Sequence, residues 1–427
     1  MIDTVAGRKP LARNVRRLAH LDIPGGGQVM VQGNYAYVGH MRPPHGTSII
    51  DVSDPRNPLV VSTIELDGPL THTHKARVVG DVMIVNCEQH NRHVLRQARE
   101  VLDRIERELG RPPTNADIAA RLKMSEDDLA MMQAAARDGY KDGGFKVYDV
   151  SDRARPRLLT YVRTHGCGTH RFDMDARYAY ISTEMEGFNG NILVIYDIAE
   201  PSRPAEVSRW WLPGQHVAGG ERATWRGYEH RLHHTMRLGD TLWASVWYAG
   251  FRAIDISDIS RPKTIGGYDY HPWSPSPTHT VFPVPFDVAG RKVAVVVDEQ
   301  HSHVHGTARA GLWIFDVGDP ANIRPISTFH LGESDSPWSL APGRFGAHQF
   351  QEHMEDTLVY CAWFAGGLRI VDVADPAHPT EVGHYIPEPV AGQPSPQSND
   401  VETDSRGLIY LLDREVGLDI LEYEGNR

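Results

Sequence analysis

Histidine is the residue type most able to do chemistry in this chain, with 23 among 427 residues. Counting seven residues back from the turn positions Asp81, Arg177 and Asp240 reaches a histidine each time, and two later segments repeat the pattern. The resulting set is His74, His170, His233, His279 and His348, with His234 as the alternative to His233 if its turn is shifted by one residue. Because neutral imidazole is the commonest metal ligand in proteins, this set predicts a metal site if its segments converge.

Three glutamates recur on the far side of the same turns. They are Glu88, Glu184 and Glu299, and the strings NCEQH and VDEQH around the first and last are nearly identical. A metal-bound histidine commonly donates its second N–H to a carboxylate, which fixes the ring and raises its basicity. We therefore expect these glutamates to back the histidines, the alternative being that they are solvated loop carboxylates.

Aromatic and further histidine side chains complete the candidate site. The strings SVWYAGF and CAWFAGG place Trp247 and Trp363, each followed by a second aromatic residue, where the other segments carry glutamate. They are expected to form an apolar pocket wall, or else to pack inside the scaffold. The remaining histidines are candidates for proton transfer or a fifth ligand, the alternative being a plain surface-loop role: His301, His303, His305 and His353.

The elements that must position these residues are repeats. The strings IIDVSDPRNP, VYDVSDRARP, IYDIAEPSRP, AIDISDISRP, IFDVGDPANIRP and IVDVADPAHP recur along the chain, and LDILEY at 418–423 is a degenerate seventh copy. Each copy reads as four short strands separated by Gly/Asp and D-P-x-x-P turns. Seven such units predict an all-β fold, a seven-bladed β-propeller of four-stranded antiparallel blades spanning residues 15–425.

Closure and strand polarity follow from the same pattern. The last unit lacks a fourth strand, whereas VRRLAHLDI at 15–23 is an unpaired one, so pairing the two would close the ring. Strand alternation then places every long connection on one face, together with the starts of the innermost strands. The five histidines are therefore expected to meet around the central channel at that face.

The repeated strands, written here ILVIYDI, LRIVDV and SIIDV, resemble those of the LVIVD-repeat β-propeller family. This resemblance covers nearly the whole chain and implies the propeller fold. It implies no particular function, because propellers host unrelated activities.

A helical insertion explains one overlong interval between repeats. Residues 91–141 have helical apolar spacing in blade two, with Thr114 and Ser125 as expected N-caps. The string ELGRPPTNADIAARLKMSEDDL resembles a helix-turn-helix unit of sigma-factor type, which would imply DNA binding. The segment is near charge balance and interrupts a blade, so we expect a lid over the site or a contact between copies of the chain.

Composition and charge limit the classes of binding partner and cellular location that we expect. The net charge is −11 and no Lys/Arg cluster is present, so no nucleic-acid partner is expected. No signal-peptide core or membrane-span-length apolar run occurs, which predicts a cytoplasmic protein without membrane contact. The three cysteines form no CxxC pair, so neither a disulfide framework nor a thiolate zinc site is indicated.

An imidazole set without thiolates suits one ion of iron, copper, manganese or zinc. Four histidines backed by glutamates on a propeller resemble the arrangement of carotenoid-cleavage-type oxygenases, which implies Fe(II) and dioxygen. The expected aromatic wall suits a small aromatic or alkenyl substrate. A redox-neutral metal-dependent hydrolase or lyase is the second interpretation, and a non-catalytic protein-binding propeller is the third.

Overall fold

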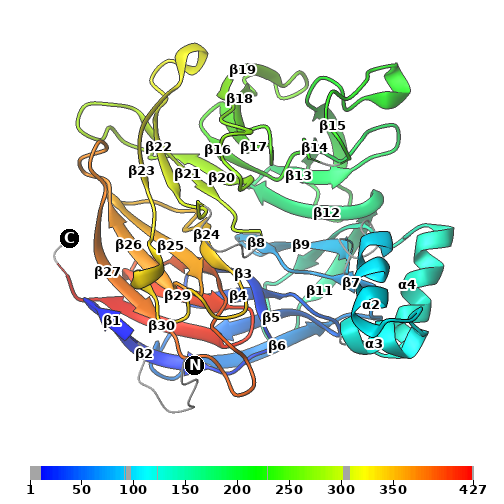
Figure 1. Ribbon diagram of the computed structural model, residues 1–427. Helices are drawn as coiled ribbons and strands as arrows, with labels where there is room; N and C mark the ends of the chain where they lie inside the picture. Colours follow the sequence, from blue (N-terminus) through cyan, green and yellow to red (C-terminus); the bar gives the residue numbers. More distant parts are fainter. Residues whose placement is uncertain are drawn as a thin grey trace.

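The computed structural model describes residues 11–90, 92, 98–122, 124–227, 229–301 and 308–425. Antiparallel sheets stand around a common centre, and the predicted seven-bladed β-propeller is confirmed (Figure 1). The aspartate of each of the first six repeats fixes a turn by accepting the backbone N–H two residues on. Asp51, for example, accepts a hydrogen bond of 2.8 Å from the backbone N–H of Ser53, which ends one strand and starts the connection to the next.

The first four blades follow the chain from the amino-terminal side, with the innermost strand first. Blade 1 contains β3 (Gly26–Gln32), β4 (Tyr35–His40), β5 (His45–Asp51) and β6 (Leu59–Glu65). Blade 2 contains β7 (Thr71–His72), β8 (Ala76–Val79), β9 (Val82–Gln89), β10 (Gly144–Asp149) and β11 (Arg157–Arg163). Blade 3 contains β12 (His165–Met174), β13 (Tyr178–Glu184), β14 (Asn191–Asp197) and β15 (Ala205–Trp210). Blade 4 contains β16 (His234–Leu238), β17 (Thr241–Ser245), β18 (Phe251–Asp255) and β19 (Lys263–Tyr268).

The last three blades complete the circle. Blade 5 contains β20 (Thr278–Pro283), β21 (Val293–Asp298), β22 (Leu312–Asp316) and β23 (Arg324–Phe329). Blade 6 contains β24 (Phe345–Phe350), β25 (Leu358–Phe364), β26 (Leu368–Asp372) and β27 (Thr380–Ile386). Blade 7 contains β28 (Ser398–Thr403), β29 (Leu408–Asp413), β30 (Gly417–Tyr423) and the amino-terminal β2 (Val15–Leu21). Short 3₁₀ turns lie in three connections: Val217–Gly219, Pro320–Asn322 and Glu333–Asp335.

The ring closes as the sequence predicted. Strand β2 pairs with β30 from Val15 opposite Tyr423 to Leu21 opposite Leu418. Figure 1 shows this blue strand beside the red carboxy-terminal one. A further strand, β1 (Leu11–Arg13), pairs with β27 at the outer edge of blade 6. The segment 11–21 therefore fastens two neighbouring blades.

The core lies between the blades. Every residue of β21 is buried, and alternate side chains pack on opposite faces of the strand. Val293 and Val295 belong to a cluster toward blade 6, whereas Ala294 and Val296 belong to a cluster toward blade 4. A strand buried on both faces reads as a continuous apolar run, which is what VAVVVD is.

The innermost strands are irregular where the candidate ligands lie. The pairing register shifts between Thr169 and Phe172, between Thr278 and Thr280, and between Phe345 and Gln349, and in blade 2 the strand is split into β7 and β8. A bulge lets consecutive residues break the strict alternation of a strand. Two neighbouring residues of one strand can thus both face the channel.

The insertion forms α2 (Ala98–Leu109), α3 (Asn115–Leu122) and α4 (Glu126–Asp138) outside the propeller (Figure 1). Both expected N-caps are present, since Ser125 accepts from the Asp128 N–H at 3.0 Å and Thr114 from the Asp117 N–H at 3.2 Å. Ile105, Ile118 and Leu129 form a separate small core. None of the described helices is long and apolar enough to cross a membrane.

Candidate metal centre on the propeller axis

Five histidines meet at the entrance of the central channel. Successive imidazole centroids are 4.9 Å apart from His74 to His170, 4.7 Å from His170 to His233, 4.3 Å from His233 to His279 and 4.2 Å from His279 to His348. The first strands of five consecutive blades supply them, as the repeat pattern predicted. We call this set the histidine arc.

Four members of the arc share one hydrogen-bonding arrangement, in which Nδ1 faces an oxygen. His170 faces the Glu88 carboxylate at 2.9 Å, His233 the carbonyl oxygen of His279 at 2.7 Å, and His279 the hydroxyl of Thr280 at 3.1 Å. The Nδ1 of His348 faces the carbonyl oxygen of Asn399. An Nδ1–H that donates to oxygen leaves the Nε2 lone pair of a neutral imidazole free for a metal.

His74 has the opposite arrangement. Asn86 accepts from the Lys75 N–H at 2.8 Å through its oxygen, so its amide group donates to the Thr169 carbonyl and to His74 Nδ1, each at 3.0 Å. A neutral His74 whose Nδ1 accepts a hydrogen bond carries its proton on Nε2. That Nε2 is buried without a hydrogen-bond partner among the described residues. His74 is thus the least suited of the five to bind a metal through Nε2.

Two Nε2 atoms of the arc face each other directly, since those of His170 and His233 are 2.9 Å apart. Burial is the main cause that lowers the pKa of His170 to about 4 and that of His233 well below its usual value. A shared proton is therefore disfavoured between these two nitrogens. Two nitrogen ligands at right angles on a metal, with bonds of about 2.0–2.1 Å, lie about 2.9 Å apart. The separation of the two Nε2 atoms matches that distance.

Glu88 lies where the sequence predicted, beside the arc. Its side chain is buried, and its carboxylate contacts His170 Nδ1, His72 Nε2 at 2.9 Å and the guanidinium of Arg92. Although burial raises the pKa of Glu88, Arg92 and His170 hold it well below its usual value. The carboxylate is thus ionised and fixes the His170 ring.

The other two glutamates differ from expectation. Glu299 is buried and pairs with Arg344 at 2.6 Å; its oxygen lies within 4.8 Å of ligand nitrogens of His233 and His279. Glu299 Oε1 also lies 3.8 Å from His348 Nε2, so this carboxylate faces a ligand atom rather than the Nδ1 side of that ring. Glu184 instead accepts a hydrogen bond of 2.9 Å from the backbone N–H of Cys167, so it braces the start of β12.

His234 does not belong to the arc. Its Nε2 contacts the ammonium of Lys75 at 3.1 Å, and its Nδ1 lies 3.7 Å from Glu352. His233 lies just before β16 and His234 is its first residue, and the two consecutive side chains face the arc and the next level of the channel.

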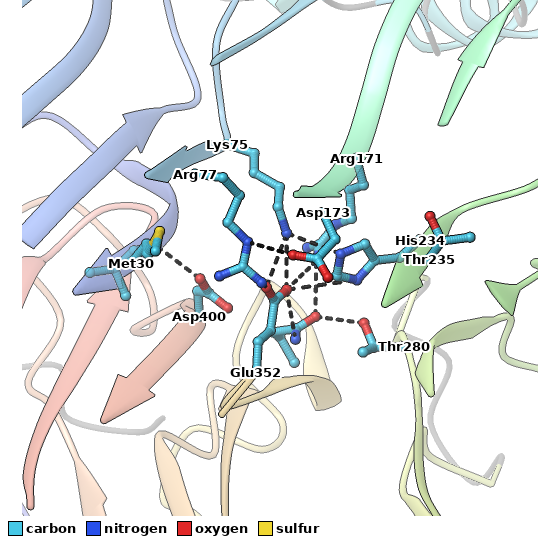
Figure 2. Close-up of polar contacts among 12 residues, drawn as sticks. Met30, Lys75, Arg77, Arg171, Asp173, His234, Thr235, Thr280, Glu352 and Asp400 are labelled. Atoms are coloured by element: carbon cyan, nitrogen blue, oxygen red, sulfur yellow. Dashed lines mark hydrogen bonds and ion pairs between the residues drawn. The ribbon is translucent and has the colours of Figure 1, made fainter. Parts of the chain in front are cut away.

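That next level is a cluster of buried charges, which we call the channel plug (Figure 2). Lys75 contacts both oxygens of Glu352 at 3.0 and 3.2 Å, and Arg77 contacts the same carboxylate. Arg77 also lies 3.5 Å from Asp173, and Arg171 donates to Gln349 at 2.9 Å. Because these ions satisfy one another across blades 2, 3 and 6, they separate the histidine arc from the opposite mouth of the channel.

In blade 6, the aromatic residue beside the arc lies one position further along the chain than expected. Trp247 stacks on His233 with centroids 4.7 Å apart, and its equivalent in blade 6 is Phe364, 4.8 Å from His348. Both have a positive φ, 56° and 42°. Trp363 points into the core between blades, where Phe329 lies 5.9 Å away. Its assignment to the pocket wall was therefore wrong by one residue.

The remaining predicted histidines divide between two places. His301 lies 5.4 Å from Trp247, near the arc. His353 lies at the opposite mouth, where its side chain is 70% exposed and 3.3 Å from Glu355, so it is neither a fifth ligand nor a proton donor at the arc. His303 and His305 lie outside the described residues.

Sequence reasoning missed several residues around the arc. His72 precedes His74 by two positions in THTH, which was a readable signal for a shared face. Arg344 and Arg414 lie 5.2 and 5.3 Å from the Phe364 ring centroid. Burial, followed by repulsion from Arg344, lowers the pKa of Arg414 to about 9. These arginines come from distant connections, and no pattern in the sequence links them to the histidines.

Comparison with known proteins supports the fold. Three parts of the chain match the LVIVD repeat, residues 26–65, 176–210 and 357–386, and residues 93–140 match Sigma-70 region 3. A search of curated proteins finds no match. None of the three repeat matches contains a histidine of the arc, so the function must be argued from the site.

Solved structures with a similar fold share little sequence. The C-terminal WD40 domain of Sif2 superposes with a TM-score of 0.52 at 7% identity, covering 96% of this chain and 99% of that one. A chain of the S. cerevisiae complex of dbp5 with nup159 and gle1 gives 0.50 at 8% identity, covering 95% and 94%. These likenesses concern the propeller alone. They lend no support to the resemblance to carotenoid-cleavage-type oxygenases.

Proposed function

We propose that the protein is a transition-metal-dependent enzyme whose metal lies on the propeller axis, bound through Nε2 of His170, His233, His279 and His348. The observation that carries this proposal is the shared arrangement of these four rings. Each directs Nδ1 at an oxygen acceptor, and the Nε2 atoms of two of them are 2.9 Å apart.

The surroundings favour a cation at this point. Buried lone pairs that face each other need a proton or a metal between them, and burial lowers the pKa of His279 and His348 as well. Glu299 adds a carboxylate within reach of the ligand atoms. A neutral nitrogen set with one carboxylate and no thiolate fits iron, copper, manganese or zinc.

We favour Fe(II) and oxygenation of a small substrate. Bound to four imidazoles, the metal would keep a position open for dioxygen. Trp247 and Phe364 flank the arc, so they would give the site an aromatic wall that suits a planar or alkenyl substrate. Glu88 would hold the proton on Nδ1 of His170, while the plug would keep solvent from entering through the far mouth.

Metal analysis tests this proposal. The purified protein should contain close to one transition metal ion per chain, and His233→Ala should lose it. His353→Ala is the matched control, because this exposed histidine lies at the opposite mouth. Both variants should keep the circular dichroism of a β-protein. Full metal occupancy in His233→Ala would refute the ligand set.

Dioxygen dependence separates the chemical alternatives. Nitric oxide added anaerobically to the Fe(II)-loaded protein should give an iron–nitrosyl signal in electron paramagnetic resonance, reporting an open position. A redox-neutral hydrolase or lyase would turn over equally well without dioxygen, and a binding propeller would hold no stoichiometric metal.

A further inference from the structure

A second cavity lies at the opposite mouth of the channel, beyond the plug. Its volume is about 470 Å³, within the range of ligand pockets in proteins. It is formed where the innermost strands end, and all seven blades contribute to it. The apolar part of its wall includes Met30, Val31, Val78, Met174, Met236 and Phe282.

The cations that line this cavity are already paired. Arg77 is engaged by Glu352 and Asp173 in the plug. Arg237 reaches Asp175 at 2.6 Å and the hydroxyl of Tyr180 at 2.7 Å. Neither guanidinium is therefore left to attract an anion into the cavity.

One carboxyl group in the wall is not neutralised in this way. Glu402 is 5% exposed, and one of its oxygens accepts a hydrogen bond of 2.9 Å from the N–H of the adjacent Thr403. Among the described residues, no ion pair reaches it. A buried carboxyl group with one short-range hydrogen bond and a cavity in front of it is an incomplete site.

Charged groups around Glu402 come from two strands. Arg77 of β8 and Lys75 just before it lower its pKa, whereas Asp400, two residues earlier on β28, raises it. Burial outweighs these effects and raises the pKa of Glu402 to about 8. At neutral pH the carboxyl group holds a proton that a bound cation would displace.

We propose that this cavity binds a small organic cation, an alkylammonium whose charge lies against Glu402 and whose carbon atoms lie against the methionines and Phe282. Methionine sulfur and an aromatic face are favourable neighbours for the polarised methyl groups of such a cation. This site is separate from the proposed metal centre and does not depend on it.

Isosteric probes test the proposal by titration calorimetry at pH 7. Choline, 3,3-dimethyl-1-butanol and 3,3-dimethylbutanoate have similar shapes but are cationic, neutral and anionic. We expect choline to bind at least about 10-fold more tightly than the other two, as one lost charge contact implies. Measurements in two buffers of different ionisation enthalpy should show proton release with choline.

Variants locate the site. Glu402→Gln should weaken choline binding at least about 10-fold and abolish proton release, whereas Glu186→Gln, at an 84% exposed side chain in blade 3, should change neither. Equal binding of the three probes, tighter binding of the carboxylate, no binding of choline, or unchanged choline binding by Glu402→Gln would each overturn the proposal. The probe comparison needs only the wild-type protein, so it holds even if the variant fails to fold.

Discussion

At the scale of single residues, hydrogen-bonding partners distinguish histidines that the sequence treats alike. His74 and His170 share one place in the repeat, yet Asn86 donates to the first and Glu88 accepts from the second. His170 is therefore suited to bind a metal through Nε2 and His74 is not. The tautomer of each imidazole depends on a neighbour from another strand.

Glu88 gives a prediction at this scale. Glu88→Gln should weaken metal affinity roughly 10–100-fold, because the His170 ring loses its anionic partner. Glu184→Gln, which lies at the equivalent place in the next blade but bonds the Cys167 backbone, should change affinity much less. Competition titrations with Zn²⁺ or Co²⁺ would measure both. Equal losses would assign the two glutamates the same role.

Glu402 gives a prediction about pH. The pKa of Glu402 is about 8 in the folded protein and near 4.3 in an unfolded chain. A raised pKa means that stability is fully present below the unfolded value and is lost as pH rises through the folded one. Glu402→Gln should thus gain stability over the wild type at pH 8.5 but not at pH 4.5.

Urea unfolding at both pH values would measure this difference. The midpoint of the variant should exceed that of the wild type only in the alkaline range. Parallel pH profiles for the two proteins would show that Glu402 is already ionised in the folded state.

At the scale of elements, the irregular innermost strands explain what could and could not be read from the sequence. The repeat places one residue per blade on the axis, which sufficed to predict the arc. In blades 2, 3 and 4 the next residue along the chain also faces the channel, so His234, Lys75 and Arg171 form a second level. Strict alternation of strand residues predicts only one level.

The same kind of shift displaced the aromatic assignment. Trp247 and Phe364 occupy equivalent places because Val246 N–H bonds Gly250 and Trp363 N–H bonds Gly367 in matching turns. The strings VWYAGF and AWFAGG align by their tryptophans in sequence but by their glycines in space. Those glycines have φ of 68° and 72°, a backbone region that other residues avoid.

The insertion gives the prediction for this scale. Cys87 pairs with Gly144 in the β9–β10 ladder, so a short Gly/Ser linker could replace residues 93–138. Arg92 and Tyr140 should be kept, because they contact Glu88 and Thr71 in the blade. The shortened protein should remain folded and bind metal, but lose turnover or change its assembly state.

Light scattering and metal analysis would test that outcome. Unchanged activity with an unchanged molar mass would refute both the lid and the contact between copies. Unfolding would show that α2–α4 support the blade, although their core of Ile105, Ile118 and Leu129 is separate from it.

At the scale of the whole molecule, closure could be predicted because the last repeat lacked a strand and the first residues supplied one. The link from β1 to blade 6 could not, since LAR at 11–13 carries no strand pattern. The position of Arg344 and Arg414 near Phe364 could not be predicted from the sequence either. They reach the arc from blade 6 and blade 7, and such long-range proximity has no local signature.

Loss of the closing strand should destabilise the ring. A protein lacking residues 1–21 would expose the edge of β30 and forfeit the β2–β30 ladder, whose hydrogen bonds contribute about 1 kcal/mol each. We expect a lower melting temperature and aggregation, measured by calorimetry and light scattering. A monomer with the melting temperature of the full chain would show that the ring does not need its closing strand.

The same closure determines how the molecule would respond to mechanical force. Val15 and Tyr423 are paired at one end of the β2–β30 ladder, so a pull on the flanking chain ends would first detach β1 from β27 and then open the β2–β30 hydrogen bonds one after another. If the two strands were pulled in shear, all of these hydrogen bonds would be loaded together and the ladder would withstand a much larger force. The β2–β30 pairing stabilises the ring against heat, yet under tension we expect the molecule to open at this pairing before the sheets of the other blades unfold.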